Sequence, residues 1–350
     1  MTQIVGGQKL PPNFNPGGIP DRVDPRDYQF EEVGFGTPAF DWGKGYDVEA
    51  LIGSKMPVKD QNGSGSCGGQ AWAYYAAALE ALATGTYEER SAKYIYAQTY
   101  VPPAGSMGRD NAEIFVKQGV ARETALTSYN NGNPPDEAFM QRAGDITPAI
   151  REDAKLDKSS AYANVICTID EIARAIRDNN GAILLIEGQD NGTWWSAYPK
   201  PPQTVIWRHW IYACKARRDG GKKYIGFINS WGKGVGEQGI QWLGEEWFTT
   251  RHITQAWTHI YSPVVPPSFH YNFVVNLKYG TTHVDIQGLQ TALQFEGFFP
   301  KNVPTTQYYG ELTRKAVLAF RVKYGISSST DPMGKSCGPL TRAKLNNIFS

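Results

Sequence analysis

Apolar and aromatic side chains recur at helical spacing in the stretch that follows Cys67. Steps of three and four residues place them on one helix face, so the spacing predicts a buried central helix. Shorter helices are expected over residues 91–100 and 111–118, and the Asn-, Gly- and Pro-rich stretch 130–135 is expected to be a loop. The positions that define the central helix are Ala71, Trp72, Tyr75, Leu79 and Leu82.

A second helical pattern begins at Thr168, which forms the spacing of a capping box with Glu171. The apolar positions behind it run to residue 176, and the pattern ends near residues 179–181. Three apolar runs come later, and we interpret them as buried strands. Helices followed by strands predict an α+β domain with two lobes. The three runs are residues 182–186, 207–213 and 224–228.

The C-terminal part of the chain has a pattern of its own. Residues 263–269 are rich in proline and predict a stiff linker. Beyond it, the sequence Gly-Glu-Leu-Thr-Arg at 310–314 recurs as Gly-Pro-Leu-Thr-Arg at 338–342. Such a repeat indicates a paired supersecondary unit. Helical stripes start near residue 285 and over 312–324, so we expect a small three-helix domain over residues 270–350.

The first 38 residues are rich in glycine and proline and are expected to run extended over the surface. We interpret them mainly as an anchoring strand, with a cover over the active-site cleft as the alternative. Residues 1–9 have neither the basic start nor the apolar core of a secretory signal, so export would need another route. No run of 18 apolar residues is present to span a membrane.

The charge balance excludes some partners. The 35 Lys and Arg residues almost equal the 34 Asp and Glu residues. Such a chain does not favour nucleic acid or an anionic membrane as its partner. The chain has four cysteines, and one of them is a candidate for chemistry, so we expect a fold that does not depend on disulfides. We also expect a monomer.

The glycine-rich loop that ends at Cys67 is the strongest chemical signal. A cysteine at the first turn of a helix meets unsatisfied backbone N–H groups and the positive end of the helix dipole. These favour the thiolate and predict a pKa below the free value of about 8.5. Gln61, six residues earlier, is positioned to offer its amide N–H beside the backbone N–H of Cys67. Together they would form an oxyanion hole.

A nucleophilic cysteine also needs a base and a group that orients the base. The expected histidine and asparagine lie roughly 130–150 residues downstream. His209 is 142 residues after Cys67, and Asn229 is 20 residues further. We interpret His209 as the general base and acid, and Asn229 as the residue that orients its ring. Cys214, on the same expected strand as His209, is interpreted as a packing residue on the opposite face.

Four blocks of sequence resemble the papain-like cysteine peptidases, over roughly residues 20 to 262. They are residues 20–28, 61–67, 207–213 and 229–239. The resemblance implies a helical lobe plus an antiparallel β lobe over residues 39–262, with Cys67, His209, Asn229 and Gln61 as its catalytic set. It also suggests that Trp231, Gly65 and Ser66 contact substrate.

The chain departs from the family pattern at three places. Ser64 stands where the family has a disulfide-forming cysteine, so that bridge is absent. Residues 68–70, Gly-Gly-Gln, replace the usual Trp-Ala-Phe, and Trp207 with Arg208 replaces the usual glycine pair before the histidine. These replacements put in doubt the shape of the first helical turn and of the leaving-group side.

The C-terminal segment resembles the small helical peptidoglycan-binding domain found at the ends of many wall-active enzymes. The matching pieces are residues 285–290, 296–299, 309–314, 317–320 and 338–342. The resemblance implies bacterial peptidoglycan as a partner. Tyr308 and Tyr309, at the Gly310 turn, are the candidate wall-contacting residues.

Two functional hypotheses remain at this stage. The first is a cysteine endopeptidase tethered to the bacterial wall, which cuts either peptidoglycan cross-link peptides or wall-associated proteins. The second is a catalytically impaired scaffold that serves as a wall-binding or virion structural protein. Both hypotheses place the protein outside the cell or at the cell wall. The protein could be encoded by a phage or by a bacterium. We expect no cofactor, and no metal, because the other histidines lack ligand spacing.

Overall fold

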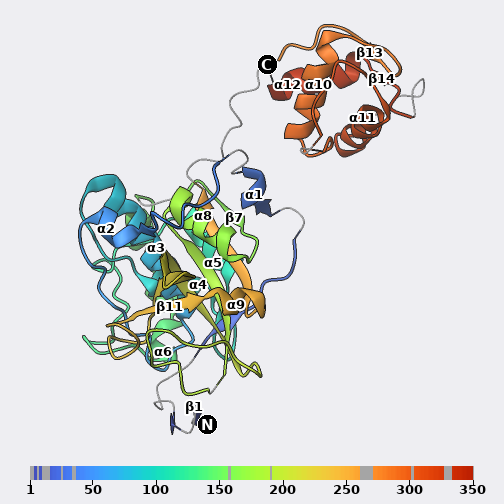
Figure 1. The fold of residues 1–350 in the computed structure, drawn as a ribbon. Coiled ribbons are helices and arrows are strands. Elements are labelled where there is room, and N and C mark those ends of the chain that lie inside the picture. Colours follow the sequence, from blue (N-terminus) through green and yellow to red (C-terminus); the bar gives the residue numbers. More distant parts are fainter. Residues whose placement is uncertain are drawn as a thin grey trace. The chain divides into compact units, whose positions relative to one another are not determined.

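The computed structural model describes residues 4–5, 8–9, 16–24, 27–33, 37–156, 159–189, 191–260, 271–300, 303–326 and 333–349 (Figure 1). The chain divides into two compact units, Met1–Pro263 and Val264–Ser350. The proline-rich linker predicted at residues 263–269 lies outside the described residues. No helix in the described parts of the chain is long and apolar enough to cross a membrane.

The first unit is built around helix α3 (Cys67–Thr84), as the apolar spacing predicts. The helix ends at Gly85, which adopts the left-handed conformation that closes helices without strain. It packs against α4 (Ala92–Thr99), capped by Ser91, and against α5 (Gly108–Lys117). Shorter helices complete this lobe: α2 (Val48–Ile52), α6 (Glu137–Met140), the 3-10 turn η1 (Ala143–Asp145) and α7 (Pro148–Ala154). Helix α1 (Phe30–Val33) instead contacts β4 (Tyr28–Gln29), and its Phe30 packs in the core on the α8 (Ile169–Asn179) side of the sheet.

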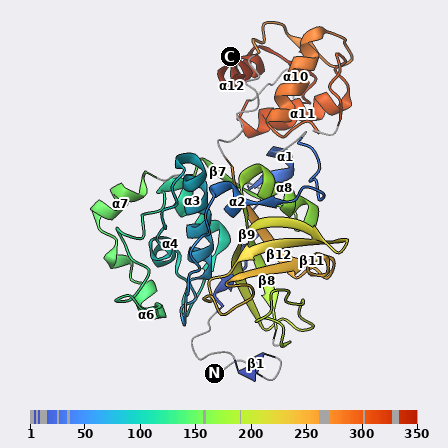
Figure 2. The same ribbon diagram turned by 60° about the vertical axis from the view of Figure 1, so that its left-hand side comes forward.

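The second lobe is a largely antiparallel sheet with strand order β11-β10-β9-β8-β12-β7-β4, and β5 pairs with β9. Only the short β4 runs parallel to its neighbour β7. Figure 2 shows α3, α4, α6 and α7 on one side of the unit and the long strands on the other. The strands are β4 (Tyr28–Gln29), β5 (Tyr46–Asp47), β7 (Ala161–Asn164), β8 (Ala182–Gly188), β9 (Trp207–Asp219), β10 (Lys222–Ile228), β11 (Ile240–Gly244) and β12 (Ile253–Ile260).

The two faces of the sheet pack into separate cores. Along β8, Ile183 and Leu185 join the core around α3, whereas Leu184 and Ile186 join the core around α8 (Ile169–Asn179). This alternation follows the two-residue period of a strand. Helix α8 begins at its predicted cap, where Thr168 accepts a hydrogen bond from the backbone N–H of Glu171. Helix α9 (Glu245–Thr249) follows β11 directly.

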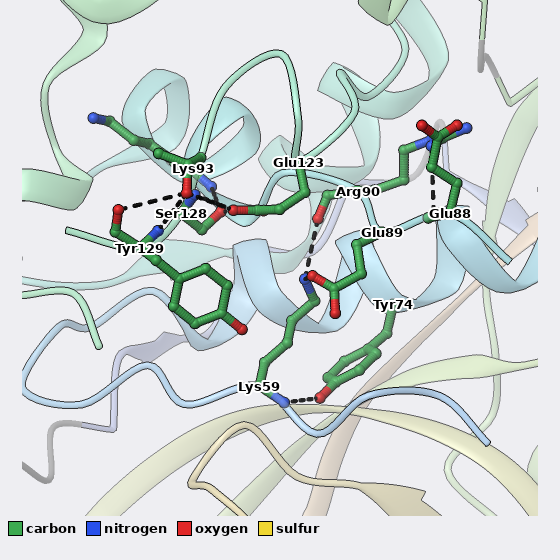
Figure 3. Close-up of polar contacts among 10 residues, drawn as sticks. Lys59, Tyr74, Glu88, Glu89, Arg90, Lys93, Glu123, Ser128 and Tyr129 are labelled. Carbon is green, nitrogen blue, oxygen red and sulfur yellow. Dashed lines mark hydrogen bonds and ion pairs between the residues drawn. The ribbon is translucent and has the colours of Figure 1, made fainter. Parts of the chain in front are cut away.

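A buried polar network in the helical lobe holds the chain segment that leads to the nucleophile loop (Figure 3). The backbone N–H of Lys59 donates to the Tyr74 hydroxyl at 2.5 Å, and Lys59 Nζ donates to the Arg90 carbonyl at 3.2 Å. The same ammonium lies 3.7 Å from the Glu89 carboxylate. A buried charge with these partners fixes its own backbone, because breaking one contact would leave the ammonium unsatisfied. The backbone position of Lys59 is therefore fixed, and with it the point from which residue 60 and Gln61 continue the chain.

The second unit contains three helices around a core of its own. They are α10 (Val284–Phe295), α11 (Glu311–Lys323) and α12 (Pro339–Phe349), with a two-stranded sheet of β13 (Leu277–Lys278) and β14 (Ser336–Cys337). The repeated sequence marks equivalent positions: Gly310 directly precedes α11, and Gly338 directly precedes α12.

Candidate active site

Cys67 is the first residue of α3 and is fully buried. The loop before it is tied to the sheet lobe, because the backbone N–H of Gln61 donates to the Ser230 carbonyl at 2.8 Å. The N–H of Gly65 donates to the Glu137 carboxylate at 2.6 Å. The thiol is thus placed at a helix start, as the sequence predicts, between two loops of different lobes.

The unusual glycines after Cys67 preserve the helix. A Cβ on Gly68 would lie 2.3 Å from Asn111 Nδ2, and one on Gly69 would lie 2.7 Å from the Ala92 carbonyl oxygen. Larger side chains would push α3 away from α4 and α5. Gly68 and Gly69 therefore allow close helix packing, and the first turn of α3 remains regular.

His209 lies on β9 and is also fully buried. Its Nε2 is 3.0 Å from Asn229 Oδ1, and Asn229 directly follows the neighbouring strand β10. The Trp231 ring stacks on the imidazole, with centroids 4.1 Å apart and an interplanar angle of 26°. Asn229 Oδ1 also accepts the Ser230 N–H at 2.8 Å. An oxygen that accepts from backbone must take a proton from the ring, so Nε2 carries the hydrogen.

This tautomer leaves His209 Nδ1 as the free base atom. Nδ1 is buried and has no hydrogen-bond partner among the described residues. The backbone N–H of Trp210, the next residue on β9, lies 3.5 Å from Cys67 Sγ. The strand that carries the imidazole therefore directly contacts the sulfur, although no thiol–imidazole hydrogen bond joins these two described residues.

Burial sets the charge state of both groups. It raises the pKa of the Cys67 thiol to about 11, although backbone N–H groups of Trp210, Gly17 and Gly68 act in the opposite direction. Burial lowers the pKa of His209 to about 3, against the opposing hydrogen bond to Asn229. The expectation of an acidified thiol is therefore wrong for this state of the protein. Desolvation outweighs the helix start, and the two groups are a neutral thiol and a neutral imidazole.

Gln61 is fully buried at the edge of the site. Its Oε1 accepts from the Ser230 hydroxyl at 2.6 Å, and its Nε2 donates to the Ser64 carbonyl at 2.9 Å. The Ser64 carbonyl can only accept, so it fixes which end of the Gln61 amide is the donor.

The three candidate substrate-binding residues have different environments. Trp231 is almost buried and covers His209. The Ser66 hydroxyl points into the protein, 2.7 Å from the Ser64 hydroxyl, so any contact of Ser66 with substrate would use its backbone. Gly65 faces the N-terminal segment, where a Cβ on Gly17 would lie only 1.9 Å from the Gly65 oxygen.

That N-terminal segment, residues 16–24, lies between the lobes and is called the strap here. Its strand β3 (Gly18–Ile19) pairs in parallel with β6 (Ser106–Met107). A Cβ on Gly18 would lie 2.8 Å from the backbone nitrogen of His209. The strap backbone therefore runs between the nucleophile loop and β9, directly over Cys67. The segment thus pairs as a short strand with β6, as an anchoring strand would, and also lies against the nucleophile loop and β9.

Polar contacts of Asp21 hold the strap in place. Its carboxylate accepts from the Arg109 N–H at 3.0 Å and from Trp257 Nε1 at 3.0 Å. The side chain of Gln255 bonds both the N–H and the carbonyl of Asp21, at 2.8 and 2.7 Å. Arg109 also pairs with Asp27 further along the chain. Burial raises the pKa of Asp21 to about 6.

One candidate wall-contacting residue must be corrected. Tyr309 is fully buried in the core of the second unit, and its hydroxyl donates to the Gly334 carbonyl at 3.0 Å. It is therefore a core residue, unavailable to a ligand. Tyr308 is 52% exposed and stays a candidate. The alternation of neighbouring side chains across an extended segment explains the difference.

Sequence reasoning missed two features near the site. The first is the glycine pair Gly17 and Gly18. Adjacent glycines can indicate a place where two backbone segments approach closely, and that was the available signal. The second is Gln241, a polar residue within the apolar run Ile240–Gly244, fully buried behind Asn229. A polar side chain in such a run indicates a specific buried partner. No cluster of three or more His, Cys, Asp or Glu suited to a metal is found in the described chain, and its four cysteines are all free thiols.

The fold is that of the papain-like cysteine proteases. One similar structure is xylellain, a cysteine protease from Xylella fastidiosa. The match covers 74% of this chain and 97% of the xylellain chain, with 20% sequence identity and a TM-score of 0.56. Digestive procathepsin L 3 of Tenebrio molitor larval midgut matches 71% of this chain over 76% of its own, at 16% identity and a TM-score of 0.54. The match to procathepsin B S9 from Trypanosoma congolense covers 71% of this chain and 87% of that chain, at 13% identity and a TM-score of 0.54. No protein-family description and no curated protein matches the sequence.

Gly17→Val tests whether the strap covers Cys67. The added Cβ would lie 1.9 Å from the Gly65 oxygen, and backbone on both sides cannot move aside. The strap should leave the site, and iodoacetamide should label Cys67 at least about tenfold faster at pH 8, because a buried thiol reacts only after local opening. Mass spectrometry identifies the labelled cysteine. Gly144→Ala, with nothing within 4 Å of its added Cβ, is the control. Unchanged labelling in folded Gly17→Val protein contradicts the assignment.

The raised pKa of Asp21 predicts that acid tightens the strap. The docked carboxyl has a pKa near 6 and a free one near 3.8, so the docked state binds its proton more readily, and docking weakens as pH rises through 6. Arg109 and Asp110 face the same carboxyl. The hydrogen-exchange protection of the Ser106 N–H, which bonds the Gly17 carbonyl at 3.0 Å, should fall about tenfold from pH 5 to pH 8. Asp21→Asn should abolish this trend. A wild-type trend of opposite sign refutes it.

Proposed function

We propose that this protein is a cysteine endopeptidase that hydrolyses peptide bonds with Cys67 as nucleophile, His209 as base and acid, and Asn229 as the orienting group. The observation that carries the proposal is the buried His209–Asn229 pair at 3.0 Å, on a strand whose next N–H contacts the Cys67 sulfur. These contacts occur in a papain-like fold. An imidazole with an unprotonated ring nitrogen, on a strand that contacts a thiol, is suited to nucleophilic catalysis.

The proposed reaction proceeds through an acyl-enzyme. With substrate in place of the strap, His209 Nδ1 takes the Cys67 proton, and the thiolate attacks the scissile carbonyl carbon. The backbone N–H of Cys67 and the side-chain amide of Gln61 stabilise the oxyanion. The intermediate collapses to a thioester as His209 protonates the leaving amine, and water, deprotonated by His209, then hydrolyses the thioester.

The strap adds a latent state to this function. Its extended backbone lies over Cys67 and pairs with β6, which is the region that an extended peptide would need. Substrate and strap therefore compete for one place. Activity requires displacement or removal of the strap, so the intact chain is a low-activity form.

The second unit would serve as a tether to bacterial peptidoglycan. Its support is a separate core, which makes it an independent module, and exposed aromatic side chains at Tyr308 and Tyr279. Tyr279 lies next to the Gly280 N–H that bonds the Tyr309 carbonyl at 2.9 Å, so the two exposed rings come from adjoining segments. The substrate would then be peptidoglycan cross-link peptides or wall-associated proteins, at the cell wall or outside the cell.

One observation favours the second function, an impaired scaffold with a binding or virion role. Cys67 is fully covered and burial raises its pKa to about 11, as expected of an inert thiol. The replaced residues near the site do not add to this doubt. Arg208 pairs with Glu187 at 2.8 Å, and the Trp207 ring packs on Trp231, with centroids 5.6 Å apart.

Hydrolysis assays distinguish the two functions. Gly17→Val protein should release fragments from unfolded casein or from purified sacculi, and mass spectrometry of the fragments names the bond. His209→Ala in the same background should lower kcat/KM by about 10²–10⁴-fold, because general base catalysis is lost. His283→Ala, in the second unit, is the control. No hydrolysis by Gly17→Val protein with freely labelled Cys67 favours the scaffold.

The tether predicts that the intact chain, made inactive by Cys67→Ala, pellets with sacculi. Tyr308→Ala should reduce the bound fraction severalfold, since an exposed ring contributes most where it stacks on a ligand. Tyr198→Ala, a comparable exposed tyrosine of the first unit, should have no effect. Binding that survives Tyr308→Ala removes that residue from the proposed surface, and no pelleting of the parent protein removes the tether.

A further inference from the structure

Gln241 is the second residue of β11, and its amide lies fully buried behind Asn229. Asn229 Nδ2 donates to Gln241 Oε1 at 2.7 Å. Gln241 Nε2 donates to two backbone carbonyls, those of Trp194 at 2.6 Å and Ser196 at 3.0 Å. Each of the three polar contacts of this amide is thus made to a defined partner.

The two carbonyls fix the orientation of the Gln241 amide. Carbonyl oxygens only accept, so the end that faces Trp194 and Ser196 must be the NH₂ group. The loop that carries these two carbonyls is itself held against the sheet lobe through neighbouring residues. The backbone N–H of Trp242 donates to the Ala197 carbonyl at 2.8 Å, and the N–H of Gly236 donates to the Trp195 carbonyl at 3.0 Å. The donor side of Gln241 cannot turn without breaking this loop.

The orientation passes from Gln241 to the imidazole. With its NH₂ group toward the loop, Gln241 presents only an acceptor to Asn229, so the Asn229 NH₂ group faces Gln241. Asn229 Oδ1 then faces His209 and accepts from Nε2 at 3.0 Å. The ring proton is held on Nε2, and Nδ1 is left unprotonated.

We propose that Gln241 is a positioning residue for catalysis, which acts together with the Ser230 N–H to fix the tautomer of His209 through the Asn229 amide. This inference rests on the proposed function, because it assigns Gln241 a part in the same site. An apolar side chain at 241 would remove the acceptor of the Asn229 NH₂ group in a place closed to solvent. The Asn229 NH₂ group would then be buried and unpaired, and of the two contacts that fix the Asn229 amide only the one from the Ser230 N–H would remain, so the preference for the Nε2–H tautomer should weaken.

Glutamate at 241 provides a chemical test of the same idea. A neutral carboxyl donates one hydrogen to a loop carbonyl and accepts from Asn229, as glutamine does. An ionised carboxylate has no hydrogen to donate and would meet two carbonyl oxygens. Gln241→Glu should therefore support the native arrangement in acid and lose it as the carboxyl ionises.

The experiment compares Gln241→Met and Gln241→Glu with the parent in full-length Gly17→Val protein. The ¹⁵N resonances of His209 report its tautomer, and hydrolysis of a soluble peptide reports kcat and KM. Wild-type Gln241 should give the Nε2–H tautomer alone. Gln241→Met should give a mixture and lower kcat by about 10- to 100-fold with KM within about twofold, because orientation of the base affects the chemical step. Gln241→Glu should approach the parent at pH 5 and fall behind it at pH 8.

The matched control is Gln290→Met in the second unit. Gln290 is a buried glutamine that also donates to a backbone carbonyl, that of Tyr308 at 2.9 Å, but it lies in a different module. It should leave the His209 tautomer and kcat unchanged. A folded Gln241→Met protein with the Nε2–H tautomer and parental kcat overturns the inference. If the parent itself hydrolyses nothing, the proposed function fails, and the tautomer ratio still decides the role of Gln241.

Discussion

The hydrogen bond between His209 Nε2 and Asn229 Oδ1 is the interaction on which the candidate site depends. It forms because β9 and β10 are neighbours in the sheet, with Ile228 paired to Tyr212 just before Asn229. The stacked Trp231 ring excludes water from it. In such a place the bond is strong, and an unpaired polar atom would be costly. One free nitrogen, Nδ1, is the consequence.

The position of the thiol has a separate origin. Cys67 is fixed by the helical lobe, through α3 and through the network that holds Lys59. Its contact with the sheet lobe is made by backbone, from the Trp210 N–H to the sulfur. Backbone contact tolerates side-chain replacement, which explains why Gly68, Gly69 and Trp207 are compatible with a regular site. The nucleophile is thus positioned by contacts within the helical lobe, and the base by contacts within the sheet lobe.

Much of this arrangement was predictable from the sequence, and the reasons for the failures are physical. Helix α3 and the cap at Thr168 follow from local spacing, because they need only neighbours in the chain. The strap contact between Gly17 and Gly65 joins residues 48 apart, and glycine alone does not name its partner. The lowered pKa expected for Cys67 considered the helix start and not the desolvation by that contact. Gln241 acts through Asn229, and no spacing rule connects the two.

In the proposed function, the covered state is inactive for an electrostatic reason as well as a steric one. Burial raises the pKa of the Cys67 thiol and lowers the pKa of the His209 imidazole. Both shifts disfavour transfer of the proton from the thiol to the imidazole. Burial is the largest cause of both shifts. Departure of the strap would readmit water, which would lower the pKa of the thiol and raise that of the imidazole. Under the proposed function, the strap would therefore control both access to the sulfur and its readiness to ionise.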